Sequence, residues 1–209
     1  MTTKRKPMIK ETVGAAYYAF NEPLNDKDFD PEAYGVVYES PVIKSIGKSE
    51  EAETAVVRSS GIDYDTVSQT SGVDLSIEVV AFHPDDLAKA RGEVVGANGM
   101  KLTGGSAKRP FVALGFPVYK RGGGQKFEWY PKCKLVENTD DIATSEESFS
   151  EQNDTLTFRA YGFNDDKNVS VVVDMESDKA PEGLTQDKFF AAPILTSAQL
   201  DTVIADLGV

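Results

Sequence analysis

Hydrophobic and polar positions alternate most regularly over residues 73–82, VDLSIEVVAF. The apolar set is Val73, Leu75, Ile77 and Val79, and the polar set is Asp74, Ser76 and Glu78. Successive side chains of a β-strand point to opposite faces of the sheet. The pattern therefore predicts a strand with one face in the core and the other in a polar environment.

Residues 109–135 predict a β-hairpin. Apolar and aromatic residues lie on both sides of the run Gly122-Gly123-Gly124. Glycine adopts positive φ at no steric cost, so the chain can reverse there. Further runs of strand composition lie at residues 13–20, 35–46, 55–58, 154–163 and 169–174. Pro41 confines the middle of its run to a sheet edge or a bulge, and residues 47–54 are interpreted as a charged linker.

Two short helices are predicted, each from a start signal and a stop signal. Pro84 and two aspartates suit the first turn of a helix over residues 84–91, and Gly92 ends it. The second helix begins at the capping-box pattern Thr196-x-x-Gln199, continues with apolar residues at helical spacing and ends at Gly208. The chain is therefore predicted to be mainly β.

The charge of the chain argues against a general nucleic-acid-binding protein. Among 209 residues there are 34 acids and 22 bases, a net charge of -12, and no basic patch of the kind that binds phosphates is visible. Residues 137–154 contain seven acids and no Lys or Arg. This segment is either a solvated acidic loop or a surface that repels DNA or an acidic neighbour.

The sequence predicts neither export nor insertion into a membrane. No apolar run reaches the roughly 20 residues needed to span a bilayer, and no apolar segment follows the basic residues 1–7. The lone Cys133 has no disulfide partner, which is typical of a protein made and kept in the cytosol.

No constellation of catalytic or metal-binding residues is evident. A Ser-His-Asp triad would have to use His83, the single histidine, and there is no G-x-S-x-G elbow. His83 and Cys133 are the only soft ligands, which excludes a zinc site. A strand rather than a helix is expected after the glycine run, so it is not a phosphate-binding loop. We expect no enzyme activity, no cofactor and no metal.

Two segments resemble a known family. The hairpin "PFVALGF" (110–116), glycine turn and "KFEWYPKCKL" (126–135) resembles the central hairpin of the major tail protein (tail tube protein) family of long-tailed, siphovirus-type bacteriophages. The strand-to-helix segment "SIEVVAFHPDDLAKARG" (76–92) is similar to the same family. The resemblance implies a β-sandwich or barrel-like core with one flanking α-helix. Residues 1–174 would form this domain with its N-terminal arm and an inter-strand loop, and residues 175–209 a C-terminal extension packed on it.

The resemblance also implies a structural role in the virion. Members of the family form hexameric rings that stack into the tail tube, a conduit for genome ejection. The expected partners are further copies of the chain, the tape-measure protein, and the tail terminator and distal tail proteins. Phage DNA would pass through the lumen without specific binding, and no membrane would be involved. The expected location is the virion tail, assembled in the bacterial host cytoplasm.

Two sets of site residues follow from the resemblance. In this family a long loop reaches neighbouring rings. The resemblance therefore implies that the corresponding segment and the N-terminal arm mediate oligomerisation. The residues assigned to this role in the segment are Lys48, Ser49, Glu50, Glu51 and Glu53. The polar face of the strand at 73–82 supplies candidates for the lumen wall, Asp74, Ser76 and Glu78, because the opposite face is apolar.

Two other classes of function remain open at this point. One is a monomeric β-sandwich carbohydrate-binding module that uses Trp129 and Tyr130. The other is an enzyme with an unrecognised carboxylate site. For the two aromatic residues, the preferred interpretation is a strand packed in a core or a subunit contact.

Overall fold

The computed structural model describes residues 6–24, 27–59, 62–104, 108–140, 142–144 and 151–205, with only the backbone of 53–59 and 62–69. The strands are β1 (Lys10–Val13), β2 (Ala16–Phe20), β3 (Tyr38–Ser40), β4 (Ile43–Ser59), β5 (Ile62–Val79), β6 (Val94–Val95), β7 (Lys101–Leu102), β8 (Val112–Lys120), β9 (Gln125–Asp140), β10 (Asp154–Ala160) and β11 (Val171–Asp174). The helices are α1 (Pro84–Arg91), α2 (Gln186–Phe189) and α3 (Ser197–Ala205).

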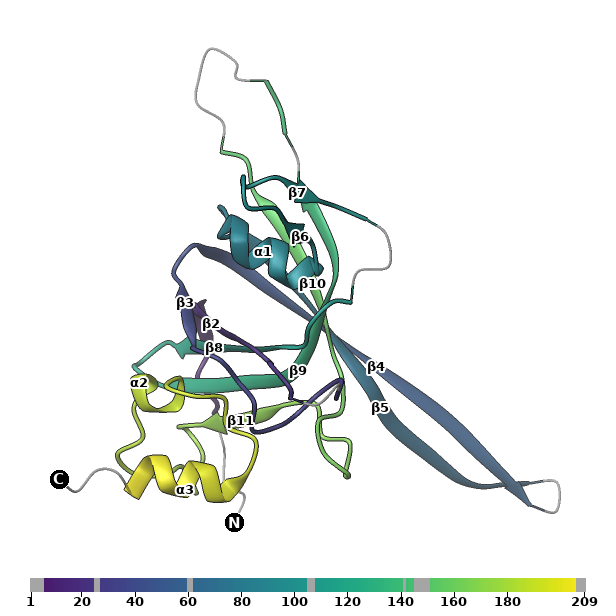
Figure 1. Cartoon of the computed structure of the whole chain (residues 1–209). Coiled ribbons are helices and arrows are strands. Elements are labelled where there is room, and N and C mark those ends of the chain that lie inside the picture. Colours follow the sequence, from purple (N-terminus) through teal and green to yellow (C-terminus); the bar gives the residue numbers. More distant parts are fainter. Residues whose placement is uncertain are drawn as a thin grey trace.

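One antiparallel sheet organises the chain (Figure 1). Its strand order is β3-β2-β8-β9-β10-β5-β4, with β1 added to β8 and β11 to β9. β6 and β7 form a separate two-stranded sheet. The prediction of a mainly β chain with a few helices is confirmed.

The first hydrophobic core lies on one face of this sheet. It gathers alternate residues of β2, β5, β8, β9 and β10, among them Leu75 and Ile77. Val13 of β1 and Ile46 of β4 pack against the same core, so strands from opposite sides of the sheet meet over it. Ala90 of α1 is buried there as well. The sheet thus curls around its core, with α1 against it.

The second core lies on the other face of β2, β8 and β9. Trp129 of β9 is fully buried there and its indole nitrogen donates a 3.0 Å hydrogen bond to the carbonyl oxygen of Phe189. Phe189 is the last residue of α2 and Phe190 follows it directly, and Leu200 of α3 packs against the same core. The C-terminal helices therefore form a layer over the sheet.

Both predicted helices are present. Gly92 ends α1 in the left-handed conformation, at φ 69°. At the start of α3 the capping box is formed: the Gln199 side chain accepts hydrogen bonds from the amides of Leu195 and Thr196, and the Gln199 amide donates to the Thr196 hydroxyl. The predicted stop at Gly208 lies outside the described residues.

The hairpin predicted at residues 109–135 is β8 and β9, and its turn uses positive φ at Gly122 and Gly123. The interpretation of residues 47–54 as a linker is wrong, because they lie within β4, a continuous strand of 17 residues paired with the 18 residues of β5. Backbone pairing with β5 holds this polar segment extended, although it lacks the apolar alternation of a half-buried strand.

Candidate assembly surfaces

The β4–β5 hairpin leaves the sheet as a two-stranded arm (Figure 1). β10 pairs with β5 only between Val79 and Val73, whereas β4 stays paired with β5 out to Ser59 and Ile62. From Gly72 outward the ribbon consists of β4 and β5 alone. In the part of the chain that the structure describes, no strand pairs with the outer edges of this arm. Such edges present free backbone donors and acceptors to another chain.

The predicted oligomerisation residues all lie on β4: Lys48, Ser49, Glu50, Glu51 and Glu53. Lys48 is opposite Leu75 and therefore on the core side of the sheet, whereas Ser49 is opposite Asp74 and on the polar side. Only the backbone of Glu53 is described. The set is thus divided between two faces.

Lys48 reaches into the protein at the base of the arm. Its ammonium nitrogen lies 2.7 and 2.9 Å from the two carboxylate oxygens of Glu128 on β9, which is only 1% exposed. Lys126 contacts the same carboxylate at 2.8 Å, and the Tyr130 hydroxyl donates to it at 3.1 Å. Neighbouring Phe116 places its ring centroid 5.8 Å from the Lys48 nitrogen.

This cluster keeps Glu128 ionised in a buried position. Burial raises the pKa of the Glu128 carboxyl, but hydrogen bonds and charge from Lys126 and Lys48 outweigh it and hold the pKa below its ordinary value. An ion pair this deeply buried needs good geometry to offset desolvation. The contact fastens β4 to β9 at the point from which the arm extends.

Arg159 of β10 connects the two predicted sets of site residues. Its guanidinium is bonded to Glu51, from the oligomerisation set, and lies 3.8 Å from Asp74, from the lumen set. Register explains the second contact, because Arg159 is directly opposite Asp74. The role of Arg159 was not found from the sequence, since the pairing of β10 with β5 cannot be read from either strand alone.

The predicted lumen residues lie on a polar sheet face. Ser76 is exposed, and Asp74 and Glu78 are partly exposed. Glu78 accepts hydrogen bonds from the Ser45 hydroxyl and from the Asn153 side-chain amide. The register places three further residues of β10 beside them: Thr155, Thr157 and Arg159. We call these six residues of β5 and β10 the polar sheet face.

The two candidate carbohydrate-binding aromatics are buried. Trp129 is 0% exposed and Tyr130 is 4% exposed. Trp129 packs at 5.4 Å between ring centroids against Phe190, and Tyr130 stacks on Phe116 at 6.1 Å. Their use as a sugar-binding surface is therefore wrong, and the preferred interpretation as a core strand is confirmed.

The two residues considered for catalysis or metal binding, Cys133 and His83, lie in different environments. Cys133 is fully buried, and burial raises the pKa of its thiol. His83 is 63% exposed, with its Nδ1 3.8 Å from a carboxylate oxygen of Asp86. Among the described residues, no three His, Cys, Asp or Glu side chains gather as a metal site. No described helix is long and apolar enough to cross a membrane.

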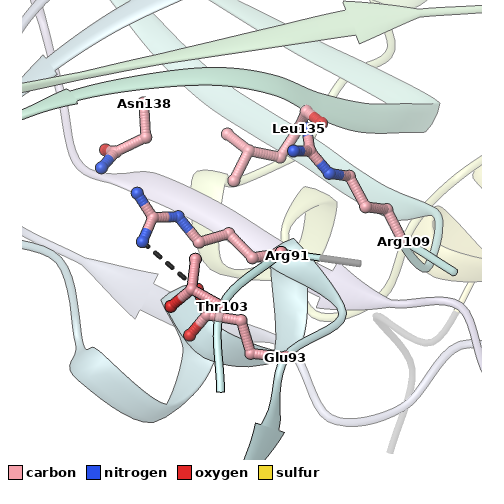
Figure 2. A pocket seen from close by; sticks show the side chains of 7 residues that line it. Arg91, Glu93, Thr103, Arg109, Leu135 and Asn138 are labelled. Carbon is pink, nitrogen blue, oxygen red and sulfur yellow. Dashed lines mark hydrogen bonds and ion pairs between the residues drawn. The ribbon is translucent and has the colours of Figure 1, made fainter. Parts of the chain in front are cut away.

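A cavity of about 270 Å³ lies between the end of α1, the chain after β7 and β9 (Figure 2). Arg109 extends along it and donates to the carbonyl oxygens of Leu135 and Val136, at 2.6 and 2.8 Å. Arg91 contacts Glu93 at 3.3 Å. Arg109 therefore holds the chain before β8 to β9, and no feature of the sequence predicted this cavity.

Comparison with known proteins identifies no family. No family model and no curated protein matches the chain. A structural match is a chain of "Cryo-EM structure of the anti-feeding prophage (AFP) baseplate, 6-fold symmetrised", at 12% sequence identity and a TM-score of 0.41. It covers 85% of this chain and 100% of that one. At this TM-score the likeness supports no inference about function.

Proposed function

We propose that the chain is a structural protein of a phage tail, and more specifically a tail-tube protein whose hexameric rings stack into a conduit for genome ejection. The resemblance of residues 76–92 and 110–135 to the tail-tube family supports this proposal. Residues 76–92 form the end of β5 and helix α1, and residues 110–135 contain the β8–β9 hairpin.

The single observation that carries the proposal is the β4–β5 arm with its unpaired outer edges. A two-stranded ribbon is only marginally stable in water by itself. A free edge gains stability by adding a strand from another chain. The arm is therefore the element through which neighbouring copies are expected to join.

The polar sheet face is the candidate wall of the lumen. It carries Asp74 and Glu78 against Arg159, with serine and threonine between them. A balanced or slightly acidic surface suits a channel for DNA, because a lysine- and arginine-rich wall would bind phosphates through counterion release. The proposed location is the virion tail, after assembly in the bacterial host cytoplasm.

The proposed partners are further copies of the chain, the tape-measure protein, and the tail terminator and distal tail proteins. DNA would pass without specific binding, and no membrane is involved. A structural role requires no catalytic residue, so we propose that the protein is not an enzyme. The carbohydrate-binding alternative depended on Trp129 and Tyr130, and both side chains are buried.

The arm can be tested by shortening it in register. Ala52 and Thr70 are directly opposite each other, so residues 53–69 can be replaced by Asn-Gly, the dipeptide that favours a two-residue hairpin turn. The Lys48–Glu128 contact lies outside the deletion. We expect the shortened chain to remain folded but to form no rings or tubes, as seen by electron microscopy and light scattering.

A length-matched chain, with residues 53–69 replaced by a Gly/Ser sequence, separates the length of the arm from its strand pairing. We expect it to fail in assembly as well, since strand edges are what the arm supplies. Normal tubes from either variant would contradict the role of the arm. A full-length chain that stays monomeric at every concentration would contradict the proposed function itself.

A further inference from the structure

Two lysines of β9 lie next to each other on one face of the sheet. Lys132 and Lys134 are two residues apart on the strand, so they share a face and are spaced about 7 Å apart along it. Lys134 is directly opposite Arg159 and therefore on the same face as that residue. The Lys132 ammonium lies 4.8 Å from the ring centroid of Phe29 and 5.2 Å from that of Phe111, and the Lys134 ammonium lies 4.1 Å from that of Phe111. The two charges thus gather at one aromatic surface.

This aromatic surface is fixed by packing. Phe111 is buried, and its ring packs edge-to-face against Phe29 at 5.6 Å and against Tyr161 at 6.1 Å. Lys132 and Lys134 are themselves partly buried. A ring attracts a cation through its quadrupole, but it carries no net charge. The rings therefore hold the two ammonium groups in place without neutralising them.

No described carboxylate forms an ion pair with either lysine. The neighbouring acid is Asp28, whose carboxylate is bound by Lys108 at 2.7 Å. Arg159 is itself paired with acids. Burial, and then the charge of Lys134, lowers the pKa of Lys132, and the opposing effect of Asp28 is smaller. Positive charge is therefore left without an ion-pair partner here, in a chain whose net charge is -12.

We propose that Lys132 and Lys134 bind a phosphate-type oxyanion. Hydrogen bonds from an ammonium to an oxyanion oxygen are about 2.7–2.9 Å long, so the oxygens of one tetrahedral group can bridge two ammonium groups at this spacing. A phosphate group carries a charge of about -1.5 to -2 at pH 7, which matches the two lysines. The site goes beyond the proposed function and does not rest on it.

Phosphorus NMR titration of the full chain with inorganic phosphate, at constant ionic strength, tests the site. Two charged hydrogen bonds lead us to expect a dissociation constant on the order of 1 mM. Replacement of both lysines, Lys132→Gln with Lys134→Gln, should weaken binding at least about tenfold. The matched control, Lys10→Gln with Lys179→Gln, changes two exposed lysines and gives the same net charge. It should bind phosphate like the parent.

A conservative pair of substitutions separates the charge from the fold. Lys132→Arg with Lys134→Arg keeps a cation over each ring, so it should retain phosphate binding. Loss of binding in this variant would overturn the site. The same conclusion would follow from unchanged binding in the glutamine pair, or from an equal loss in the control pair, because the binding would then reflect net charge alone.

Competition identifies the source of the phosphate. Displacement of inorganic phosphate by a short single-stranded oligonucleotide would assign the site to a nucleic-acid backbone, and lack of displacement would assign it to a free phosphate. Binding of a poly-glutamate peptide without binding of phosphate would replace the proposed ligand by an acidic polypeptide. Tubes that form from a chain unable to bind phosphate would overturn this site alone. Phosphate binding by a chain that stays monomeric would contradict only the proposed function.

Discussion

At the scale of single residues, Glu128 is a buried charge that other groups of the protein have to compensate. A carboxylate that is 1% exposed must be compensated by protein groups, and here two lysines and a tyrosine hydroxyl do so. Lys48 is the member of this cluster that comes from the arm strand. Its ammonium therefore joins the arm strand to the buried Glu128 carboxylate inside the sheet.

Removal of Lys48 should weaken the fold. We expect Lys48→Met to lower the free energy of unfolding by about 1–3 kcal/mol at neutral pH, because a buried carboxylate loses a charged hydrogen-bond donor. Urea denaturation measures the change. Lys44→Met is the matched control: Lys44 pairs with Glu151 at the surface, and such a pair contributes less than about 1 kcal/mol.

The Lys48 effect has a defined pH dependence. The Glu128 pKa is below its ordinary value of 4.5 in the folded protein, so stabilisation by its charge is present above the unfolded-state pKa. It is lost as the pH falls through the folded-state pKa. The difference between Lys48→Met and the parent should therefore shrink in acid, and an equal or growing difference would contradict the assignment.

A second residue-scale prediction concerns two acids at the open end of β9 and β10. Asp154 and Asp140 are directly opposite each other. Partial burial, then the Asp140 charge, raises the pKa of Asp154. Asp140→Asn should therefore stabilise the fold at neutral pH by about 0.2–1 kcal/mol, the scale of a cross-strand pair. In urea unfolding the gain should fade as acid protonates Asp154, because the repulsion in the parent then disappears.

At the scale of elements, Gly115 allows the C-terminal layer to approach the sheet. A Cβ at this position would lie 2.7 Å from Trp129 and 2.9 Å from Phe190. We expect Gly115→Ala to lower the free energy of unfolding by about 1–3 kcal/mol, as overpacking does. Gly47→Ala on β4 is the control, because the nearest atom to its Cβ is 3.8 Å away. Equal thermal stability of the two variants would contradict this packing role.

The elements with a buried face were the ones predictable from sequence. β5 between residues 73 and 79 has one face in the core, and its side chains alternate accordingly. Residues 47–54 of β4 were wrongly interpreted as a linker because this polar segment is held by backbone pairing, which leaves no periodic signature. The interpretation of Trp129 as a core residue is confirmed, because a large aromatic side chain on a strand buries a large apolar surface.

The candidate surfaces were harder to predict from the sequence. The contact of Arg159 with Glu51 and Asp74 depends on the register of three strands. The exposure of Val94 on β6 and Leu102 on β7 depends on which apolar residues the fold leaves uncovered. Hydrophobic composition alone does not distinguish a small core strand from an exposed patch. Those features required the arrangement of the whole chain.

At the scale of the whole molecule, the net charge of -12 leads to a prediction about DNA. We expect neither the free chain nor its assemblies to retain duplex DNA in a filter-binding assay at physiological salt, because like charges repel. Binding in the micromolar range that weakens as salt is added would reveal a basic surface. That result would contradict the proposed lumen while leaving self-assembly unaffected.

The burial of Trp129 beneath the C-terminal layer has a spectroscopic consequence. The chain contains one tryptophan, so its ultraviolet-excited emission comes from a single site between the sheet and the end of α2, at Phe189 and Phe190. Detachment of residues 181–205 would let water reach the indole and shift the emission to longer wavelength. Fluorescence thus gives this protein a built-in optical report on the docking of its C-terminal layer.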